Sequence, residues 1–281
     1  MSEDAPEYIL PEPAKEVERL TEQDAVITYH MGGKRILAPL DLSQPGLQIL
    51  DSGTADGLWL REIQPLLVEP YSLRGFDIMP SFFPSETPPH TTLEIHDITE
   101  PWPEQLHGQF DLVHQRATLL GGGMKSSARE CVRLLVKLVK PGGWIQLGEN
   151  DVSKPVHGGP AMHHVWQALA VWFDTASRGD GQFASKMASW LLEEGFENVR
   201  EEYINIDIGP RCKDPEWGAR SAKVMLNAAV GVVGAIPMLK AEIAPEVVEK
   251  LPERVTEEWV KDGATYGFIY VVGQKPLACR G

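Results

Sequence analysis

Three things are scarce in this chain of 281 residues: cysteine, basic charge and long apolar runs. Its cysteines, Cys131, Cys212 and Cys279, are too few and too far apart for a disulfide framework or a metal knuckle, so we expect a reducing, cytoplasmic setting and no metal site. With 40 acidic against 26 basic residues the net charge is −14, which argues against nucleic acid or an anionic membrane as a partner. No run of about 18 uncharged apolar residues occurs, and the first residues lack a signal-peptide pattern, so we expect neither a membrane span nor secretion.

Apolar residues are plentiful, at 43%, which is enough for the core of one large domain. In the first half of the chain, strand-like runs alternate with helix-like segments. Strands are predicted at 47–50, 73–76, 91–95, 110–113 and 144–147, and helices at 13–31, 58–67 and 126–139, the last ended by Pro141, Gly142 and Gly143. This alternation predicts an α/β fold with a doubly wound, mostly parallel sheet.

The second half of the chain is mainly helical in pattern. Helices are predicted at 161–177, 183–194, 217–239 and 245–261, and strands at 199–208 and 266–273. We expect the helices between these two strands to form a cap over the sheet.

Acidic residues follow the first three predicted strands: Asp51, Asp77 and Asp97. In an open parallel sheet, ligands bind at the carboxyl ends of the strands, where carboxylates can accept ribose hydroxyls or face a cationic group. His114, Gln115 and Arg116 come at the end of the fourth strand. One such residue is commonly a turn or a helix cap, but the ordered series indicates a nucleoside site.

The turn after the first strand reads DSGTADG, from Asp51 to Gly57. The dinucleotide fingerprint G-x-G-x-x-G is incomplete, because Ala55 and Leu58 occupy its second and third glycine positions. The acid before the turn would also repel a pyrophosphate, whereas it suits an ammonium or sulfonium group. The pattern therefore favours a cationic nucleoside over NAD-dependent reduction.

At these motifs the chain resembles the class I S-adenosylmethionine-dependent methyltransferases, and more closely the fungal LaeA-like group of secondary metabolism. The matching segments lie between residues 20 and 200 and include LQILDSGTADGLWLREI, LRGFDIMPSFFP, DITEPWP, FDLVHQR and LLVKLVKPGGWIQLGE. The resemblance implies a seven-stranded Rossmann-like methyltransferase sheet whose last strand is antiparallel and inserted beside the sixth. It also implies an N-terminal arm and lid helix (1–40), a cofactor-binding core (41–210), a helical cap insertion (211–262) and a final core strand with a tail (263–281).

The resemblance assigns cofactor residues in chain order. The methionine part would lie against Asp51, Gly53, Thr54, Ala55 and Gly57. Ribose would meet Asp77 and Ile78, adenine would meet Asp97 and Ile98, and His114 and Arg116 would lie under the methyl or carboxylate end.

The acceptor side is less marked in the sequence. His114 and His163 are candidates for a general base, and Tyr29, His30, Glu149 and Trp166 are candidates for acceptor binding. Each has a structural alternative: a capping or solvent-facing histidine, a carboxylate that caps a helix or turn, or an aromatic side chain that packs in the core.

The activity implied by the resemblance is transfer of a methyl group from S-adenosylmethionine, leaving S-adenosylhomocysteine, to an O, N or S atom of a small-molecule acceptor. Two alternatives keep the cofactor: a regulatory protein that acts through protein partners, and a rearrangement without transfer. The uncharged run AAVGVVGAIPML suits either a pocket wall or the face of a homodimer formed through the cap.

Overall fold

The computed structural model describes residues 12–123 and 125–277. Residues 1–11 of the predicted arm, and Cys279 in the tail, lie outside the described residues. Seven strands form one sheet in the order β3-β2-β1-β4-β5-β7-β6. They are β1 (Leu47–Ser52), β2 (Tyr71–Asp77), β3 (Thr91–Ile95), β4 (Phe110–Arg116), β5 (Val139–Asn150), β6 (Glu197–Ile208) and β7 (Ala264–Gln274).

The direction of the strands confirms the predicted fold class. Strands β1 to β5 pair in parallel, and β7 lies antiparallel between β5 and β6. The last strand is therefore inserted beside the sixth, as expected. Strand β1 reads Leu-Gln-Ile-Leu-Asp-Ser and is buried at every position but one, because helices cover both faces of the sheet.

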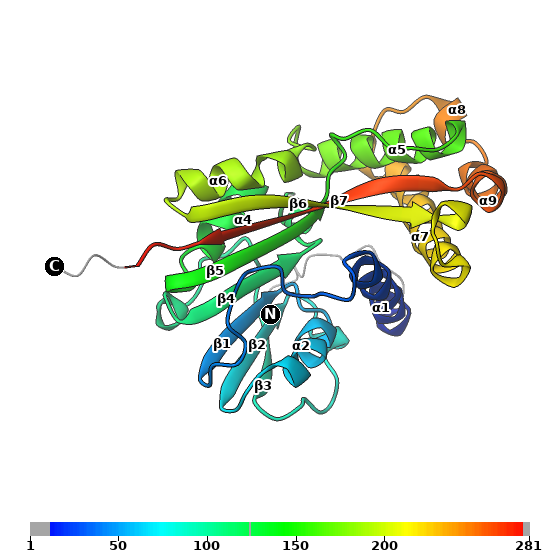
Figure 1. Ribbon diagram of the computed structural model, residues 1–281. Coiled ribbons are helices and arrows are strands. Elements are labelled where there is room, and N and C mark those ends of the chain that lie inside the picture. The colour runs from blue at the N-terminus through cyan, green and yellow to red at the C-terminus, as the bar shows by residue number, and fades with distance from the viewer. Residues whose placement is uncertain (1–11, 124, 278–281) are drawn as a thin grey trace.

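The helices of the described residues lie on both sides of this sheet (Figure 1). They are α1 (Pro13–His30), α2 (Leu58–Ile63), α3 (Leu119–Gly122), α4 (Ala128–Leu135), α5 (Pro160–Ala176), α6 (Met187–Glu193), α7 (Pro215–Leu239), α8 (Pro245–Val248) and α9 (Leu251–Lys261). Leu50 and Val113 face the larger core, which includes side chains of α4, α5 and α6. Their neighbours Ile49 and Leu112 face a smaller core beneath α2. The alternation along each strand thus divides one sheet between two cores.

Two predicted helix boundaries are wrong. Helix α4 ends at Leu135, and Val139 already pairs with Phe110, so Pro141, Gly142 and Gly143 lie inside β5 at a register shift rather than at a helix end. A Cβ on Gly143 would lie 2.8 Å from the carbonyl oxygen of Phe110, and this close approach of two strands requires glycine. The helix predicted at 245–261 is split into α8 and α9, because Lys250 adopts a left-handed conformation with φ of 49°.

Helix α7 is the one helix in the described ranges that is long and apolar enough, by length and composition, to cross a membrane. Its inner side chains Val224, Met225 and Val232 are buried in the larger core, where α7 packs against α1, α5 and α9. The same length and composition are found in core helices of proteins that do not enter a membrane. The expectation that the chain does not associate with a membrane stays a prediction.

Candidate active site

The turn between β1 and α2 is built from three left-handed residues. Gly53, Ala55 and Gly57 have φ values of 72°, 51° and 78°. Ala55 thus keeps the left-handed backbone that favours glycine, at a cost of about 1–2 kcal/mol. At Gly53 the side chain of Thr118 fills the adjacent space, since a Cβ there would lie 2.1 Å from Thr118 Oγ1. Because Gly53 and Gly57 have no side chains, this turn exposes backbone groups at the carboxyl end of β1.

Asp77 is the last residue of β2, Asp97 lies two residues after β3, and both carboxylates accept hydrogen bonds from nearby backbone N–H groups. The Asp77 carboxylate accepts hydrogen bonds from the backbone N–H of Ala55 at 2.8 Å and of Met79 at 2.9 Å. Burial raises the pKa of Asp77, against the opposing effect of these N–H donors. Asp97 is also partly buried, but its bonds to Lys125 and Thr99 outweigh burial and lower its pKa.

Asp51 and His114 form a buried pair between β1 and β4. The Nδ1 of His114 lies 2.7 Å from Asp51 Oδ1, so Nδ1 carries the proton and donates it to the carboxylate. The indole of Trp59, from α2, stacks on the imidazole with ring centroids 3.8 Å apart and an angle of 3°. His114 is only 1% exposed, and burial lowers its pKa despite the nearby carboxylate. The imidazole is therefore neutral at pH 7.

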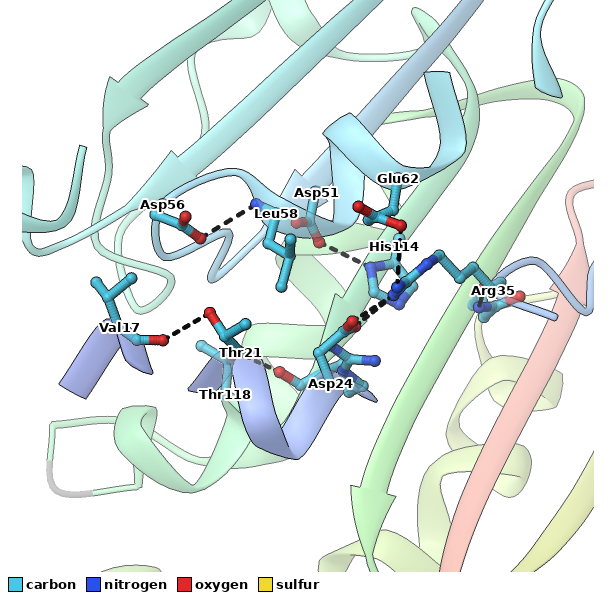
Figure 2. Close-up of polar contacts among 12 residues, drawn as sticks. Val17, Thr21, Asp24, Arg35, Asp51, Asp56, Leu58, Glu62, His114 and Thr118 are labelled. Carbon is cyan, nitrogen blue, oxygen red and sulfur yellow. Dashed lines mark hydrogen bonds and ion pairs between the residues drawn. The ribbon is translucent and has the colours of Figure 1, made fainter. Parts of the chain in front are cut away.

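A second buried cluster joins α1 to the end of β4. Asp24 on α1 accepts from Arg35 Nη1 at 2.6 and 2.5 Å, and from Arg116 Nη2 at 2.7 Å. Burial raises the pKa of Asp24, but the two guanidinium groups outweigh it and hold the pKa below its usual value. Figure 2 shows Asp24 and Arg35 beside the Asp51–His114 pair, at the start of α2.

Sequence reasoning missed Asp24, Arg35, Trp59 and Thr118. A signal existed for Asp24, which lies at helical spacing between Leu20 and Ile27 on the side of α1 that packs against the molecule. An acid at such a position is buried only when it has partners. The partners themselves could not be read from the sequence.

Four buried polar atoms on β1, β4 and the turn have no hydrogen-bond partner among the described residues. They are Ser52 Oγ, Thr54 Oγ1, His114 Nε2 and Gln115 Oε1. A buried polar atom without a partner is costly, so such a group points to a polar ligand or water at this edge.

Comparisons with known proteins identify the family. No family model matches the chain. It is 36% identical over 260 residues to the methyltransferase psoC of Aspergillus fumigatus, covering 92% of this chain and 94% of that protein. It is 36% identical over 286 residues to the N-methyltransferase sirN of Leptosphaeria maculans, covering 98% of each. It is 31% identical over 278 residues to the N-methyltransferase gliN of Aspergillus fumigatus, covering 96% of each.

The chain belongs to this family of fungal methyltransferases. It is a class I S-adenosylmethionine-dependent methyltransferase that acts on a small-molecule acceptor. Its fold is shared by a chain in the complex of the Haloferax volcanii Trm112 methyltransferase activator with a methyltransferase, at a TM-score of 0.51 and 14% identity over 94% of this chain and 96% of that one.

The residues at the strand ends of this methyltransferase fit the cofactor. Carboxylates stand at the ends of β1, β2 and β3 in the order expected for ammonium, ribose and adenine. The unpartnered hydroxyls of Ser52, at the end of β1, and of Thr54, in the following turn, lie where the methionine part would bind. Ile78 is half-buried and Ile98 is buried, next to the carboxylates of Asp77 and Asp97.

Two candidates for acceptor binding, Glu149 and His30, form hydrogen bonds with the backbone of neighbouring segments. Glu149 Oε1 accepts from the backbone N–H groups of Thr118 and Leu119, at 3.0 and 2.9 Å, at the start of α3. His30 Nε2 accepts from the backbone N–H of Asp207 at 3.1 Å, while its Nδ1 lies 2.9 Å from the Val26 carbonyl oxygen. Both side chains therefore fix neighbouring segments.

The structure does not bring the other two candidates on the later part of the chain to the Asp51 edge. His163 is exposed in the first turn of α5, where the backbone N–H groups of the two preceding residues, Ala161 and Met162, donate to Glu258 of α9. Trp166 is buried in the larger core and donates its Nε1 proton to the Lys154 carbonyl oxygen at 2.8 Å.

Tyr29 lies in a surface hollow between α1 and α7. Its ring stacks on Trp217 at 4.4 Å between centroids, and Arg35 also lines the hollow. Because Arg35 binds Asp24, and Asp24 binds Arg116, this hollow adjoins the strand ends.

Proposed function

We propose that this methyltransferase transfers a methyl group to a nitrogen atom of its small-molecule acceptor. The observation that carries the proposal is the match, over nearly the full length of both chains, to relatives named as N-methyltransferases, sirN and gliN. Bound S-adenosylmethionine supplies a methyl group already activated by its sulfonium charge. The protein then has to align the acceptor, which accounts for about 7–11 kcal/mol of the barrier in well-oriented reactions.

The cofactor contacts are proposed as follows. Asp51 would face the ammonium group, Asp77 the ribose hydroxyls, and Asp97 with Ile98 the adenine, while Arg116 would hold the carboxylate. Gly53, Thr54, Ala55, Gly57 and Ile78 would line the same path with backbone and small side chains.

His114 is proposed to orient Asp51 rather than to act as a general base. Its Nδ1 proton is bonded to Asp51, Trp59 covers the ring, and the side chain is almost completely buried. A neutral amine nitrogen can attack through its lone pair without a base, which agrees with a nitrogen acceptor.

The acceptor is proposed to enter through the hollow lined by Tyr29, Arg35 and Trp217. These side chains offer flat aromatic surface and a cation beside the strand ends. A regulatory role through protein partners is not favoured, because the full-length relatives are named as enzymes. A cytoplasmic location, a homodimer through α7, and the absence of nucleic-acid or membrane partners stay predictions.

The ribose assignment is tested by replacing Asp77 with Asn and measuring S-adenosylhomocysteine binding by calorimetry. We expect the affinity to fall by about tenfold or more, because hydrogen bonds to a charged group contribute about 1.5–3 kcal/mol. Glu94→Gln is the matched control, since Glu94 is an exposed acid on the neighbouring strand β3. Equal affinity in the Asp77 variant and in the wild type would remove the assignment.

The acceptor atom is tested with methyl-labelled S-adenosylmethionine and a panel of small amines, phenols and thiols. We expect label in amine products. Label confined to phenol or thiol products would contradict the nitrogen proposal, and label in no small molecule would contradict the activity as a whole.

A further inference from the structure

We infer that Asp24, on the N-terminal helix α1, is a positioning residue that holds the Arg116 guanidinium toward the cofactor carboxylate. The inference rests on the proposed function, in which Arg116 binds that carboxylate. It extends the cofactor site to a helix that contributes no residue to the strand-end motifs.

The geometry ties Asp24 directly to Arg116. Asp24 is 3% exposed, and its Oδ1 accepts from Arg116 Nη2 at 2.7 Å across 92 positions of sequence. The side chain of Tyr270 on β7 also lies beside Arg116. The bond to Asp24 holds one side of the guanidinium group and leaves its other N–H groups for a ligand.

The charges of the cluster are arranged around Asp24. The carboxylate of Asp24 faces two guanidinium groups, those of Arg35 and Arg116. Glu62 approaches only Arg35, at 3.4 Å, and is half exposed. The two guanidinium groups and the two carboxylates balance in charge, so the feature that suits a carboxylate ligand is the set of Arg116 N–H groups that Asp24 does not use.

Docking of α1 alone does not account for a buried carboxylate at this position. Helix α1 is already held by Val26 and Ile27 in the core, by the Tyr29–Trp217 stack, and by the bond of His30 to Asp207. A buried ion pair adds little net stability because each charge loses its hydration. The Asp24 carboxylate can orient Arg116, which the apolar contacts of α1 cannot do.

The test compares two ligands in the full-length protein. S-adenosylhomocysteine has the carboxylate, whereas 5′-methylthioadenosine lacks the amino-acid part but keeps the adenosine and sulfur. The variants are Asp24→Asn, Arg116→Ala and the double variant, with Glu22→Gln as the control. Glu22 also joins α1 to α7, through Arg220, but does not touch Arg116.

Asp24→Asn is expected to lower the affinity for S-adenosylhomocysteine by about tenfold and to leave the affinity for methylthioadenosine unchanged. The double variant should bind no more weakly than Arg116→Ala alone, since Asp24 acts through Arg116. Glu22→Gln should bind both ligands as the wild type does.

Three results would overturn the inference. If Asp24→Asn lowers the affinity for both ligands equally, Asp24 only supports the fold. The same conclusion follows if the losses of affinity in the two single variants add in the double variant. Unchanged binding of S-adenosylhomocysteine by Asp24→Asn, with a loss in Arg116→Ala, would mean that Arg116 needs no positioning.

An unchanged affinity in Arg116→Ala would instead remove the proposed carboxylate contact, and the inference with it. If Asp24→Asn does not fold, Asp24→Glu keeps the charge and displaces the carboxylate by one methylene. Its loss should again be confined to S-adenosylhomocysteine, and an equal loss of both ligands would contradict the inference.

Discussion

Glu149 is a single carboxyl group whose chemistry is changed by its place at the end of β5. Burial raises its pKa to about 7, although Gln115 and the backbone N–H groups of Thr118 and Leu119 all donate to it. Desolvation of the charged form outweighs these donors. Glu149 is therefore close to half protonated at neutral pH, which an exposed glutamate would not be.

This raised pKa makes stability depend on pH. The folded protein binds the Glu149 proton more tightly than the unfolded chain, so the contribution to stability is full below pH 4.5 and is lost as the pH rises to about 7. Glu149→Gln should remove that dependence and raise the free energy of unfolding at pH 8 by up to about 3 kcal/mol. Urea unfolding at pH 5 and pH 8 measures it, with exposed Glu104→Gln as the control. A variant that is less stable than the wild type at pH 8 would contradict the expectation.

The residues that could be predicted from sequence are those whose role follows from local position. Asp51, Asp77 and Asp97 could be placed at strand ends because each follows an apolar run. Asp24 and Arg116 are 92 positions apart, and no local pattern announces that one accepts from the other. Ala55 shows a related limit, because its left-handed backbone is kept without the glycine that signals it.

At the scale of elements, an aromatic stack and an ion pair join α1 to α7. The rings of Tyr29 and Trp217 are 9° from parallel, and the Arg220 guanidinium lies 4.2 Å from the Trp217 centroid. Glu22 on α1 pairs with the same arginine. These contacts join two helices that are about 200 residues apart in the chain.

Trp217→Ala should therefore increase local opening of α1, while the free energy of global unfolding changes less. The variant loses the stack, which contributes about 0.5–1.5 kcal/mol beyond the buried area. Hydrogen exchange of residues 13–30 should become faster. Trp172→Ala is the control, since Trp172 is also half-buried but packs on Phe173 of α5 and should leave exchange in α1 unchanged. Exchange in α1 that does not change in either variant would show that the stack does not hold the helix.

The boundaries of elements were predicted less well than their existence. The split between α8 and α9 depends on the conformation of Lys250, a residue type that ordinarily continues a helix. The length of β5 depends on its pairing with β4 and β7. The sequence does not show this length, because the run Pro-Gly-Gly inside the strand is typical of a loop.

At the scale of the whole molecule, one continuous core joins helices α1, α7 and α9 to the sheet. It contains Val26 of α1, Val232 of α7 and Trp259 of α9 together with Leu50 and Val113 of the central strands. The alternation of strands and helices predicts the sheet, but the place of the last strand beside the sixth comes from the family resemblance. Periodicity does not reveal which strands are neighbours.

This shared core predicts a single thermal transition. S-adenosylhomocysteine at about 100 times its Kd should stabilise the protein by about 2.7 kcal/mol, which raises Tm by roughly 5 °C, and removal of the ligand should reverse the shift. Scanning calorimetry measures both. Two transitions, of which only one moves with ligand, would show that the cap unfolds separately from the sheet.

The place of β7 has a consequence for synthesis. It is the last of the seven strands along the chain, yet it lies between β5 and β6 in the sheet. While the chain is on the ribosome, β5 and β6 each have an open edge, because the place between them in the sheet belongs to β7. Strands β1 to β5 can pair as they emerge from the ribosome. Strand β6 and the helices that pack on it cannot join the sheet until β7 has been made. Until then the nascent chain has open strand edges on which another chain could pair.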